Sequence, residues 1–414
     1  MKILYIHQHF STPQGSGSIR SYQFAKMLIS RGHQVALVCG SNQKAVVGLS
    51  APYNRGVRRG FVDGIDIIEI HVPYSNHDGF LRRVWKFCLF SFGASRRALS
   101  EDYDLVFASS TPLTVALPGI LAKLFRRKLF LFEVRDLWPE LPAAMGIIKN
   151  RFVLCCLSYF EKLTYKTADH CIGLSPGMCE GIKKAGISPD CITLIPNGCD
   201  LNIMSQAALT PELEVRWSNN FSQDDFVAIF AGAHGVANGL DAILDVAEIL
   251  LDRQEYNIKF LFVGEGKLKR ELRDRAAGKN LVNCIFWDPV PKCAMFGLLS
   301  RASIGLMLLR NIPAFYEGTS PNKFFDYIAS GLPVVNNYPG WVAELIKQNE
   351  CGVVVQPDDP LAFSEALLAL RAMPKDELVQ MGCNARKLAL REFDRSALSE
   401  EFSILCEKIY GSGI

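Results

Sequence analysis

The residue types best suited to chemistry gather near the carboxyl end of the chain, between residues 317 and 335. A Gly-Thr-Ser loop at 318–320 precedes Pro321, which stands just inside the start of a predicted helix. Small residues at a helix start leave backbone N–H groups free to bind an anion. Lys323 follows in the first turn, where a cation opposes the helix dipole, so we expect it to have an anionic partner. Asp326, three residues on, is placed to accept two ribose hydroxyls, although a surface Lys323–Asp326 pair would also fit this spacing.

Two further glycine loops follow apolar segments in the second half of the chain. Residues 230–235 read Phe-Ala-Gly-Ala-His-Gly, and Asn238 then opens a predicted helix. Residues 262–267 read Phe-Val-Gly-Glu-Gly-Lys at the end of the next apolar segment. Exposed N–H groups in such loops suit a diphosphate, and His234 could add a donor. Residues 287–291, Trp-Asp-Pro-Val-Pro, end the following segment and would suit a flat base.

In the first half, a loop that carries Gly15 and Gly17 follows the first apolar segment. It differs from the dinucleotide fingerprint because an arginine occupies the third glycine position and no acidic residue ends the next strand, so we do not expect NAD. Residues 133–140 hold three carboxylates and an arginine, among them Arg135 and Asp136. Such groups are costly to desolvate. We interpret them as side chains that orient a sugar hydroxyl or polarise a leaving group, or as an Arg–Asp pair that fixes the loop.

The elements that must position these loops are short apolar segments alternating with helical patterns. Segments that are apolar on both faces are typical of parallel strands covered by helices, so we predict an α/β fold with doubly wound parallel sheets. The predicted strands are 3–6, 34–39, 65–70, 105–108, 129–132, 170–173, 192–195, 226–230, 259–263, 282–286, 303–306, 333–335 and 352–355. The pattern restarts after the turn at 196–200, which predicts two Rossmann-like domains, 1–205 and 206–392, that face a cleft. Ligands of such sheets bind beyond the carboxyl ends of the strands, where the loops above are predicted to lie.

Composition bounds the class of protein. The chain has 414 residues, of which 49% are hydrophobic and 21% are charged. These fractions are close to the average of globular proteins, which excludes a disordered, collagen-like or coiled-coil protein. The first residues read as a strand and no run reaches ~18 apolar residues, so we expect neither a signal peptide nor a transmembrane helix. Thirteen scattered cysteines without a C-x-x-C favour reduced thiols in a cytoplasmic protein and disfavour zinc.

Charge is divided unevenly along the chain. Residues 1–205 hold 24 Lys and Arg against 15 Asp and Glu, and the remainder holds 21 against 27. A basic first half suits an anionic surface or substrate. Residues 79–99 interleave aromatic side chains with arginine and lysine, and 123–128 add more cations. This pattern predicts peripheral association with an anionic leaflet, although an ordinary helix packed on the sheet would also fit it. We find no nucleic-acid-binding motif.

Together these motifs resemble glycosyltransferase family 4, a retaining family with the GT-B fold, over essentially the whole chain. The likeness is carried by the first glycine loop, by residues 31–35, 195–200 and 263–266, and by the helix-turn-strand at 326–335. Within the family, Val134–Pro139 and Ser320–Lys323 are most similar to a bacterial surface-polysaccharide branch that includes N-acetyl-L-fucosamine transferases. The resemblance also implies that a last helix, about 393–414, crosses back onto the first domain.

By this resemblance, Asp326 stands where the second Glu of the family's E-x7-E motif holds the ribose. Gly318 stands at the first Glu, and Glu317 is one residue out of register. The family's Arg and Lys that hold the diphosphate are replaced by Ala233 or His234 and by Asn238. Our hypothesis is that Lys323 supplies the displaced charge with His234 assisting. Arg135 stands where many members carry a histidine near the reacting sugar.

The candidate catalytic residues are therefore Arg135, Asp136, Glu317 and Lys323. The candidate donor-binding residues are Gly15, Gly17, Gly232, His234, Asn238, Gly264, Gly266, Val290, Gly318, Thr319, Ser320, Asn322, Lys323 and Asp326.

The resemblance implies transfer of a sugar, such as an N-acetylated deoxyhexosamine, from a UDP-linked donor to a lipid-diphosphate-linked saccharide. The setting would be O-antigen, capsule or exopolysaccharide synthesis at the cytoplasmic face of a bacterial inner membrane. The family needs no metal or other cofactor, and the D-x-D at 102–104 precedes a strand, so we expect a turn there and no metal site. Retention implies front-face attack in which the donor phosphate takes the acceptor proton, without a protein nucleophile. A UDP-sugar 2-epimerase-like enzyme and a catalytically silent assembly subunit remain alternatives.

Overall fold

The computed structural model describes residues 1–15, 18–42, 46–74, 78–204 and 208–412. The chain divides into two compact units. Unit 1 comprises 1–197, 317–320 and 395–414, and unit 2 comprises 198–316 and 321–394. Each unit has its own sheet and its own apolar core.

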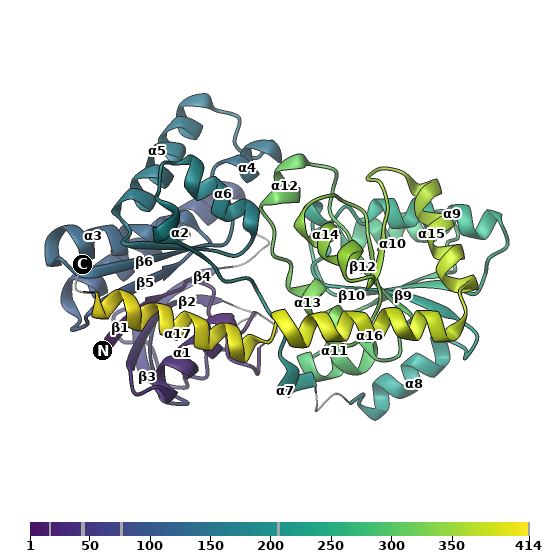
Figure 1. Cartoon of the computed structure of the whole chain (residues 1–414), viewed down its shortest axis with the longest axis horizontal. Helices are drawn as coiled ribbons and strands as arrows, with labels where there is room; N and C mark the ends of the chain where they lie inside the picture. Colours follow the sequence, from purple (N-terminus) through teal and green to yellow (C-terminus); the bar gives the residue numbers. More distant parts are fainter. Residues whose placement is uncertain (16–17, 43–45, 75–77, 205–207, 413–414) are drawn as a thin grey trace. The chain divides into compact units, whose positions relative to one another are not determined.

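Unit 1 contains an eight-stranded sheet in the order β3-β4-β2-β1-β5-β6-β7-β8 (Figure 1). Its strands are β1 (Lys2–Ile6), β2 (Gln34–Asn42), β3 (Val57–Val62), β4 (Ile65–Tyr74), β5 (Leu105–Ser109), β6 (Leu129–Val134), β7 (His170–Gly173) and β8 (Ile192–Leu194). Its helices are α1 (Arg20–Ser30), α2 (Phe80–Ser100), η1 (Leu113–Val115), α3 (Ala116–Arg126), α4 (Glu140–Ala144), α5 (Arg151–Thr167), α6 (Pro176–Lys184), η2 (Pro189–Cys191) and α17 (Arg395–Gly411). All strands pair in parallel except β3, which is antiparallel to β4.

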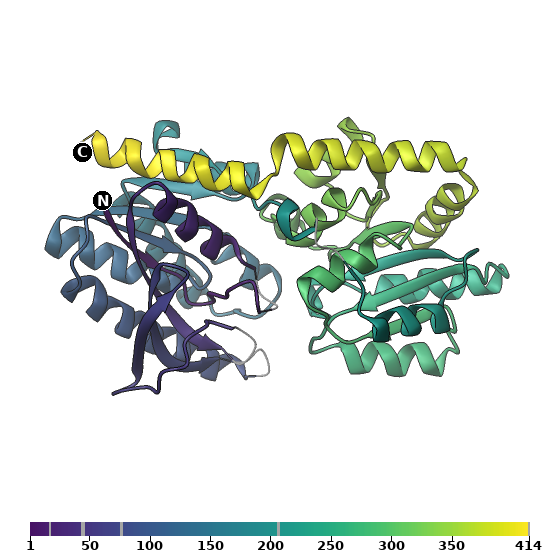
Figure 2. The ribbon, with the colours of Figure 1, turned by 90° about the horizontal axis from the view of Figure 1, so that it is seen from below.

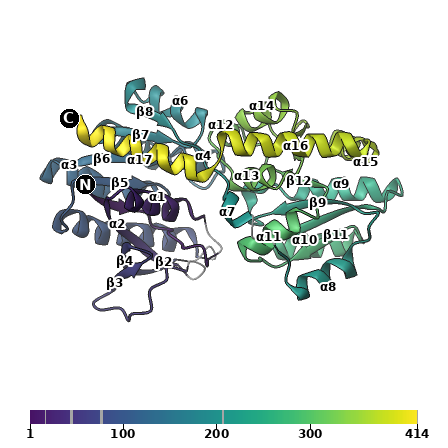
Figure 3. The ribbon, with the colours of Figure 1, turned by 60° about the horizontal axis from the view of Figure 1, so that its bottom comes forward.

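Alternate side chains of the central strands point into two apolar cores, one on each face of the sheet. On β1, Leu4 and Ile6 face the core under α2 and α3, whereas Ile3 and Tyr5 face the core under α1 and α17. Helix α17 lies along α1, with the rings of Phe24 and Phe402 stacked at 4.3 Å (Figures 1, 2 and 3). The predicted return of the last helix to the first domain is therefore confirmed.

Unit 2 contains a six-stranded, wholly parallel sheet in the order β11-β10-β9-β12-β13-β14. Its strands are β9 (Phe226–Ala231), β10 (Ile258–Val263), β11 (Cys284–Trp287), β12 (Ile304–Met307), β13 (Val334–Asn336) and β14 (Gly352–Val354). Its helices are α7 (Leu201–Met204), α8 (Pro211–Asn220), η3 (Val236–Asn238), α9 (Asp241–Asp252), α10 (Lys269–Gly278), α11 (Lys292–Leu299), α12 (Pro313–Glu317), α13 (Asn322–Ala329), α14 (Trp341–Gln348), α15 (Pro360–Ala372) and α16 (Lys375–Glu392).

Both sheets follow the doubly wound order, so the predicted fold class is confirmed. The direction of winding reverses between β1 and β5 in unit 1, and between β9 and β12 in unit 2. Ligands of doubly wound folds bind at this reversal, beyond the carboxyl ends of the strands. The residues that follow these four strands are therefore the first place to look for a site.

Strand β3 was not predicted. It forms a hairpin with β4 through Asp63 and Gly64, whose φ angles are 51° and 86°. Positive φ at both turn positions is the type I′ geometry, for which Asp-Gly is a favoured pair. The Asp-Gly pair was thus a usable signal, but the exposed edge strand before it lacks the continuous apolar run of the others.

Candidate functional site

At the carboxyl edge of the unit 1 sheet, His7 links β1 to Arg135, which follows β6. Arg135 Nη1 lies 3.2 Å from His7 Nε2, and His7 Nδ1 lies 2.7 Å from Ser21 Oγ on α1. Burial, with Arg135 as the next cause, holds the pKa of His7 well below its usual value. Because a guanidinium only donates, Nε2 accepts and Nδ1–H donates to Ser21. The neutral imidazole thus fixes one side of Arg135.

Asp136 lies at the same edge and is half-buried. Its carboxylate accepts a hydrogen bond from the Thr111 hydroxyl, and the Arg135 amide donates to Ser110 Oγ at 2.9 Å. Burial raises the pKa of Asp136. The loop after β5 therefore positions both candidate residues, which remain close enough to the surface to meet a ligand.

Glu133, by contrast, is fully buried in an ion pair that the sequence did not predict. Its Oε1 lies 2.8 Å from Arg20, and its Oε2 accepts from Ser109 at 2.5 Å. Arg20 also donates to the carbonyls of Ile195 at 2.8 Å and Pro196 at 2.5 Å. This pair joins β5, β6, α1 and the end of the first domain, so Glu133 is not available to a substrate.

The first glycine loop is only partly described. A Cβ on Gly15 would lie 2.1 Å from Ser11 Oγ, so the Ser11 hydroxyl would have to turn away to admit a side chain there. Gly17 lies outside the described residues.

The segment 317–320 packs on unit 1. The Glu317 carbonyl accepts from Ser175 Oγ at 2.9 Å, while the Glu317 residue is exposed. Asn197 donates two hydrogen bonds to Ser320. Its backbone amide donates to the Ser320 hydroxyl at 3.1 Å, and its side-chain amide donates to the Ser320 carbonyl at 2.7 Å. Gly318 is buried and Thr319 half-buried between them. The Glu317 side chain therefore lies at the surface, on a backbone that Ser175 holds in place.

In unit 2, Lys323 lies in the first turn of α13 and reaches the loop after β9. Its Nζ is 2.5 Å from Asn238 Oδ1 and 4.4 Å from the ring of Phe230. The side chain also lies against Gly232, where a Cβ would be 3.4 Å from Lys323 Cε. Burial lowers the pKa of Lys323 to about 7. The structure therefore brings together three of the predicted residues, Lys323, Asn238 and Gly232.

The glycines of the β9 and β10 loops pack against each other. A Cβ on Gly264 would lie 1.8 Å from the carbonyl oxygen of Gly232, and one on Gly266 would lie 2.4 Å from that of His234. Both glycines are thus required by loop–loop packing, which holds the two loops in one layer at the carboxyl edge.

His234 lies beneath this layer. Its side chain has no exposed surface, and its ring is 6.1–6.3 Å from those of Phe230, Phe262 and Phe286. Burial lowers its pKa to about 4, so the ring is neutral. Among the described residues neither ring nitrogen has a hydrogen-bond partner. In this conformation His234 supports the loops from below, and its predicted contact with the donor stays a prediction.

Lys269, which the sequence did not mark, ties the ends of β10 and β11 together. Its Nζ lies 2.9 Å from the Gly264 carbonyl, 3.1 Å from the Trp287 carbonyl and 2.6 Å from the Asp288 carboxylate. The Glu265 carboxylate lies 3.5 Å from the same Nζ, and a largely buried ammonium group that is shared among four oxygens fixes the edge of the site.

Asp326 also has a partner that the sequence did not predict. Lys292 Nζ, at the start of α11, lies 2.7 and 2.6 Å from its two carboxylate oxygens. Lys292 thereby fixes the orientation of the Asp326 carboxylate, whose predicted contact with the ribose stays a prediction. Beside it, Asn322 Oδ1 is buried and has no partner among the described residues.

The segment after β11 corrects one expectation. Trp287 is 1% exposed and packs against Trp217 and Phe221, because its aromatic surface completes the core under α8. It is therefore not available to stack on a base. The half-buried Val290 is the member of this segment that was predicted to contact the donor.

The D-x-D segment forms the predicted strand-entry turn. Asp102 pairs with Lys2 Nζ at 2.5 Å, and Asp104 accepts from the Lys2 amide at 2.7 Å. Within the described ranges, no group of three or more His, Cys, Asp or Glu side chains is arranged to hold a metal ion.

Comparison with protein families identifies two matches, one in each half of the chain. Residues 17–198 match the "Glycosyl transferase 4-like domain" and residues 225–372 match "Glycosyl transferases group 1". Together the two matches cover well over half of the chain. Among curated proteins, no sequence matches significantly.

Solved structures with the same fold share little sequence with this chain. A sucrose-phosphate synthase from Thermosynechococcus elongatus is 17% identical with a TM-score of 0.75, and the match covers 99% of both chains. WaaG, a glycosyltransferase involved in lipopolysaccharide biosynthesis, is 16% identical with a TM-score of 0.68 over 97% of this chain and 99% of its own. HepE of Anabaena, solved in complex with UDP-glucose, is 15% identical with a TM-score of 0.68 over 99% of this chain and 100% of its own.

Proposed function

Because the chain belongs to the glycosyltransferases with the GT-B fold, we propose that it transfers a sugar from a nucleotide-sugar donor to a lipid-linked saccharide. The observation that carries this proposal is the Lys323–Asn238 contact beside Gly232, at the winding reversal of the unit 2 sheet. A lysine whose pKa burial lowers to about 7, and whose closest partner is a neutral amide, is better satisfied by a diphosphate.

In this proposal the donor lies along the carboxyl edge of unit 2. The ribose hydroxyls bind Asp326, which Lys292 holds in place. The diphosphate binds Lys323 and the N–H groups of the glycine loops. As the bond to the sugar breaks, charge grows on the leaving diphosphate, and these donors stabilise it without a metal. The donor phosphate takes the acceptor proton, so the reaction retains configuration without a protein nucleophile.

Unit 1 then supplies the acceptor side. Arg135, fixed by neutral His7, and Asp136, held by Thr111, orient the acceptor at the edge of the sheet. Glu317 stands in for the missing first Glu of E-x7-E and contacts the donor sugar. UDP is the proposed nucleotide, because UDP-glucose is bound in the HepE structure and UDP-2-fluoro glucose in a trehalose-6-phosphate relative from E. coli. An N-acetylated deoxyhexosamine is the proposed sugar.

Thermal unfolding in the presence of a panel of nucleotide sugars tests this function. A donor at about 100 times its Kd stabilises a folded protein by about 2.7 kcal/mol, so the true donor should raise Tm by several degrees. Release of UDP by the same sample distinguishes an active transferase from a silent assembly subunit, and sugar epimerisation without an acceptor would reveal the epimerase alternative. No shift with any nucleotide sugar would contradict the proposal.

Binding of UDP-glucose measured at pH 6 and at pH 8 tests the role of Lys323. Lys323 must be protonated to bind the diphosphate diester, which keeps its two charges across this range. Below its pKa of about 7 Lys323 carries the proton already, and above it the proton must be taken up on binding. Affinity for UDP-glucose should therefore fall by about tenfold between pH 6 and pH 8. A flat profile would show that Lys323 does not meet the diphosphate.

We further propose that unit 1 rests on an anionic membrane through the helices on one face of its sheet. Helices α2, α3 and α5 cover that face, and they expose Leu81, Trp85, Phe125 and Phe152 by 64–81%. Arginine and lysine side chains lie between these apolar groups along the same helices. No helix in the described part of the chain is long and apolar enough to cross a bilayer.

Flotation with anionic liposomes tests this surface. Leu81→Glu combined with Trp85→Glu should lower the bound fraction severalfold at low salt, because it replaces inserted apolar groups with anions. Val282→Glu is the matched control, since Val282 is 61% exposed but lies on unit 2. Equal flotation of both variants would contradict the proposed membrane face.

A further inference from the structure

One arginine at the carboxyl edge of the unit 2 sheet has no part in the function proposed so far. Arg310 lies three residues after β12, one of the two strands between which the winding of this sheet reverses. Its side chain is exposed, and its guanidinium has no hydrogen bond or ion pair among the described residues. Exposed arginines are ordinary on protein surfaces, so the meaning of this one depends on what holds it in place and on what lies beside it.

The backbone of Arg310 is held on both sides. Leu309, directly before it, is buried, and the Asn337 side chain accepts from the Leu309 amide at 2.9 Å and donates to its carbonyl at 3.1 Å. The Arg310 amide donates to the Ala237 carbonyl at 2.9 Å, and the Arg310 carbonyl accepts from the Ile312 amide at 2.7 Å. The guanidinium is therefore an unpaired group on a fixed backbone.

The contact with Ala237 places Arg310 beside the diphosphate site proposed above. Ala237 directly precedes Asn238, whose side chain accepts from Lys323 at 2.5 Å. Gly239, on the other side of Asn238, has a φ of 55°, and a Cβ there would lie 3.0 Å from Arg310 Cα and 3.1 Å from its amide nitrogen. Both the φ angle and this close approach favour glycine, so the two loops pack backbone to backbone.

The cations described so far at this edge do not balance the charge of a diphosphate. The diphosphate of a nucleotide sugar carries two negative charges, and the nucleotide carries more once the sugar has left, whereas Lys323 offers one positive charge. Lys269 and Lys292 each already pair with a carboxylate at 2.6 Å. Arg310 has no such partner among the described residues, and its guanidinium presents a planar fork of N–H donors that matches phosphate oxygens.

The order of contacts places Arg310 beyond Lys323 as seen from the ribose. Asp326, the proposed ribose ligand, and Lys323 lie three residues apart on α13, nearly one helical turn. Lys323 reaches Asn238, and Arg310 packs against the two neighbours of Asn238. Along this line the ribose comes first, Lys323 second and Arg310 last.

We propose that Arg310 binds the phosphate that carries the sugar in the donor. This inference rests on the proposed function and assigns a donor-binding residue that none of the sequence motifs predicted. When the bond to the sugar breaks, its electron pair passes to an oxygen of this phosphate. Negative charge therefore grows beside Arg310, and the guanidinium stabilises the leaving group more than it stabilises the bound donor.

Calorimetric titration of UDP and UMP into the full-length protein tests this assignment. Arg310→Ala should weaken UDP by about tenfold or more, because a hydrogen-bonded charge pair is lost. It should leave UMP almost unchanged, because UMP lacks the second phosphate. Arg310→Lys should retain part of the affinity for UDP, since it keeps the charge but not the fork of donors. The Tm without ligand should stay the same, since the side chain is exposed.

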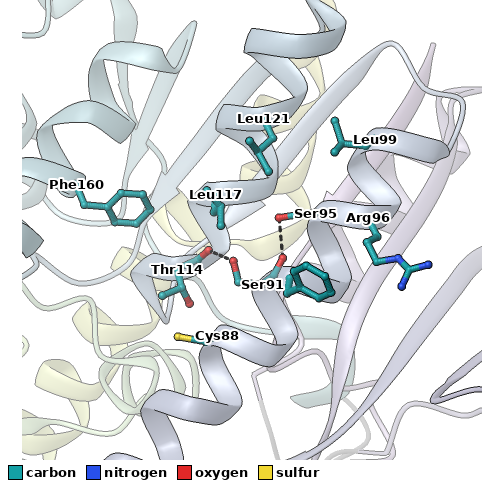
Figure 4. A pocket seen from close by; sticks show the side chains of 10 residues that line it. Cys88, Ser91, Ser95, Arg96, Leu99, Thr114, Leu117, Leu121 and Phe160 are labelled. Atoms are coloured by element: carbon teal, nitrogen blue, oxygen red, sulfur yellow. Dashed lines mark hydrogen bonds between the residues drawn. The ribbon is translucent and has the colours of Figure 1, made fainter.

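Two further variants serve as controls. Arg96→Ala removes another exposed arginine, which lines the groove between α2 and α3 of unit 1 (Figure 4), and it should not change UDP binding in a lipid-free sample. Lys267→Ala removes an exposed lysine that follows β10, away from the winding reversal, and it should also have no effect. If Lys267→Ala weakens UDP as much as Arg310→Ala, the edge attracts the nucleotide by its general charge and the inference is wrong.

The outcomes separate this inference from the proposed function. If the wild type binds UDP and Arg310→Ala binds it equally well, Arg310 does not meet the diphosphate, and the proposed function is unaffected. If Arg310→Ala weakens UMP as much as UDP, the arginine does not bind the second phosphate and its assignment is wrong. If the wild type binds no UDP at all, the proposed function is contradicted together with this inference.

Discussion

Replacing Lys323 with alanine is expected to lower kcat/KM for the nucleotide sugar by about 100- to 1,000-fold, the usual effect of removing one donor from a developing oxyanion. The ammonium group lies 2.5 Å from Asn238 at the point where the unit 2 sheet reverses its winding. Loss of the charge leaves the diphosphate with backbone N–H groups and the proposed contact with Arg310. Steady-state kinetics with the donor found by thermal shift would measure the change.

Two further variants separate the loss of charge at Lys323 from the loss of packing and from a general effect of removing a lysine. Lys323→Met keeps the packing of the side chain on Phe230 but not its charge, so it should be as inactive as Lys323→Ala and should show no pH dependence of UDP-glucose binding near pH 7. Lys375→Ala removes an exposed lysine from the first turn of α16 and should have no effect. Wild-type kinetics in Lys323→Met would remove Lys323 from the donor site.

The largest expected effect on stability comes from Arg20. Arg20→Ala leaves Glu133 as an unpaired charge with no exposed surface, and removal of one partner from such a buried pair costs about 3–5 kcal/mol. It also removes the donors to the carbonyls of Ile195 and Pro196 and the packing of the guanidinium 4.3 Å from the Phe24 ring. The urea unfolding midpoint of Arg20→Ala should therefore lie at a lower urea concentration than that of the wild type.

Arg31 provides the matched control for this experiment. It lies directly after α1 and pairs with Glu407 at 2.8 Å, but both side chains are 32% exposed. Solvent already screens that pair, so Arg31→Ala should change stability far less than Arg20→Ala. Replacing both members of the buried pair, as Arg20→Met with Glu133→Gln, should restore much of the loss. Equal unfolding of Arg20→Ala and the wild type would show that this ion pair does not stabilise the domain.

The fold followed from local patterns because parallel strands buried on both faces must be apolar throughout. Strand β9 reads Phe-Val-Ala-Ile-Phe-Ala and begins at the predicted residue. Strand β3 was not predicted because one face of an edge strand meets solvent, as the 77% exposure of Phe61 shows. Its recognition needed the Asp63-Gly64 turn rather than apolarity.

The candidate site was predictable in outline but not in its pairs. Glycine loops and helix starts can be recognised from a few neighbouring residues, which is why Gly232, Asn238 and Lys323 could be named from the sequence. The partners Arg20 and Glu133 are 113 residues apart, and Lys292 and Asp326 are 34 apart. No local spacing links such residues, because only the strand order brings them together. For the same reason the burial of His234 and Trp287 could not be read from their neighbours.

The most direct test of the account is a crystal structure of the protein with uridine diphosphate. We predict density at the carboxyl edge of the unit 2 sheet, with a phosphate oxygen about 2.7–3.2 Å from Lys323 Nζ and the ribose hydroxyls on Asp326. Uridine diphosphate ordered elsewhere, with Lys323 still bound to Asn238, would contradict it.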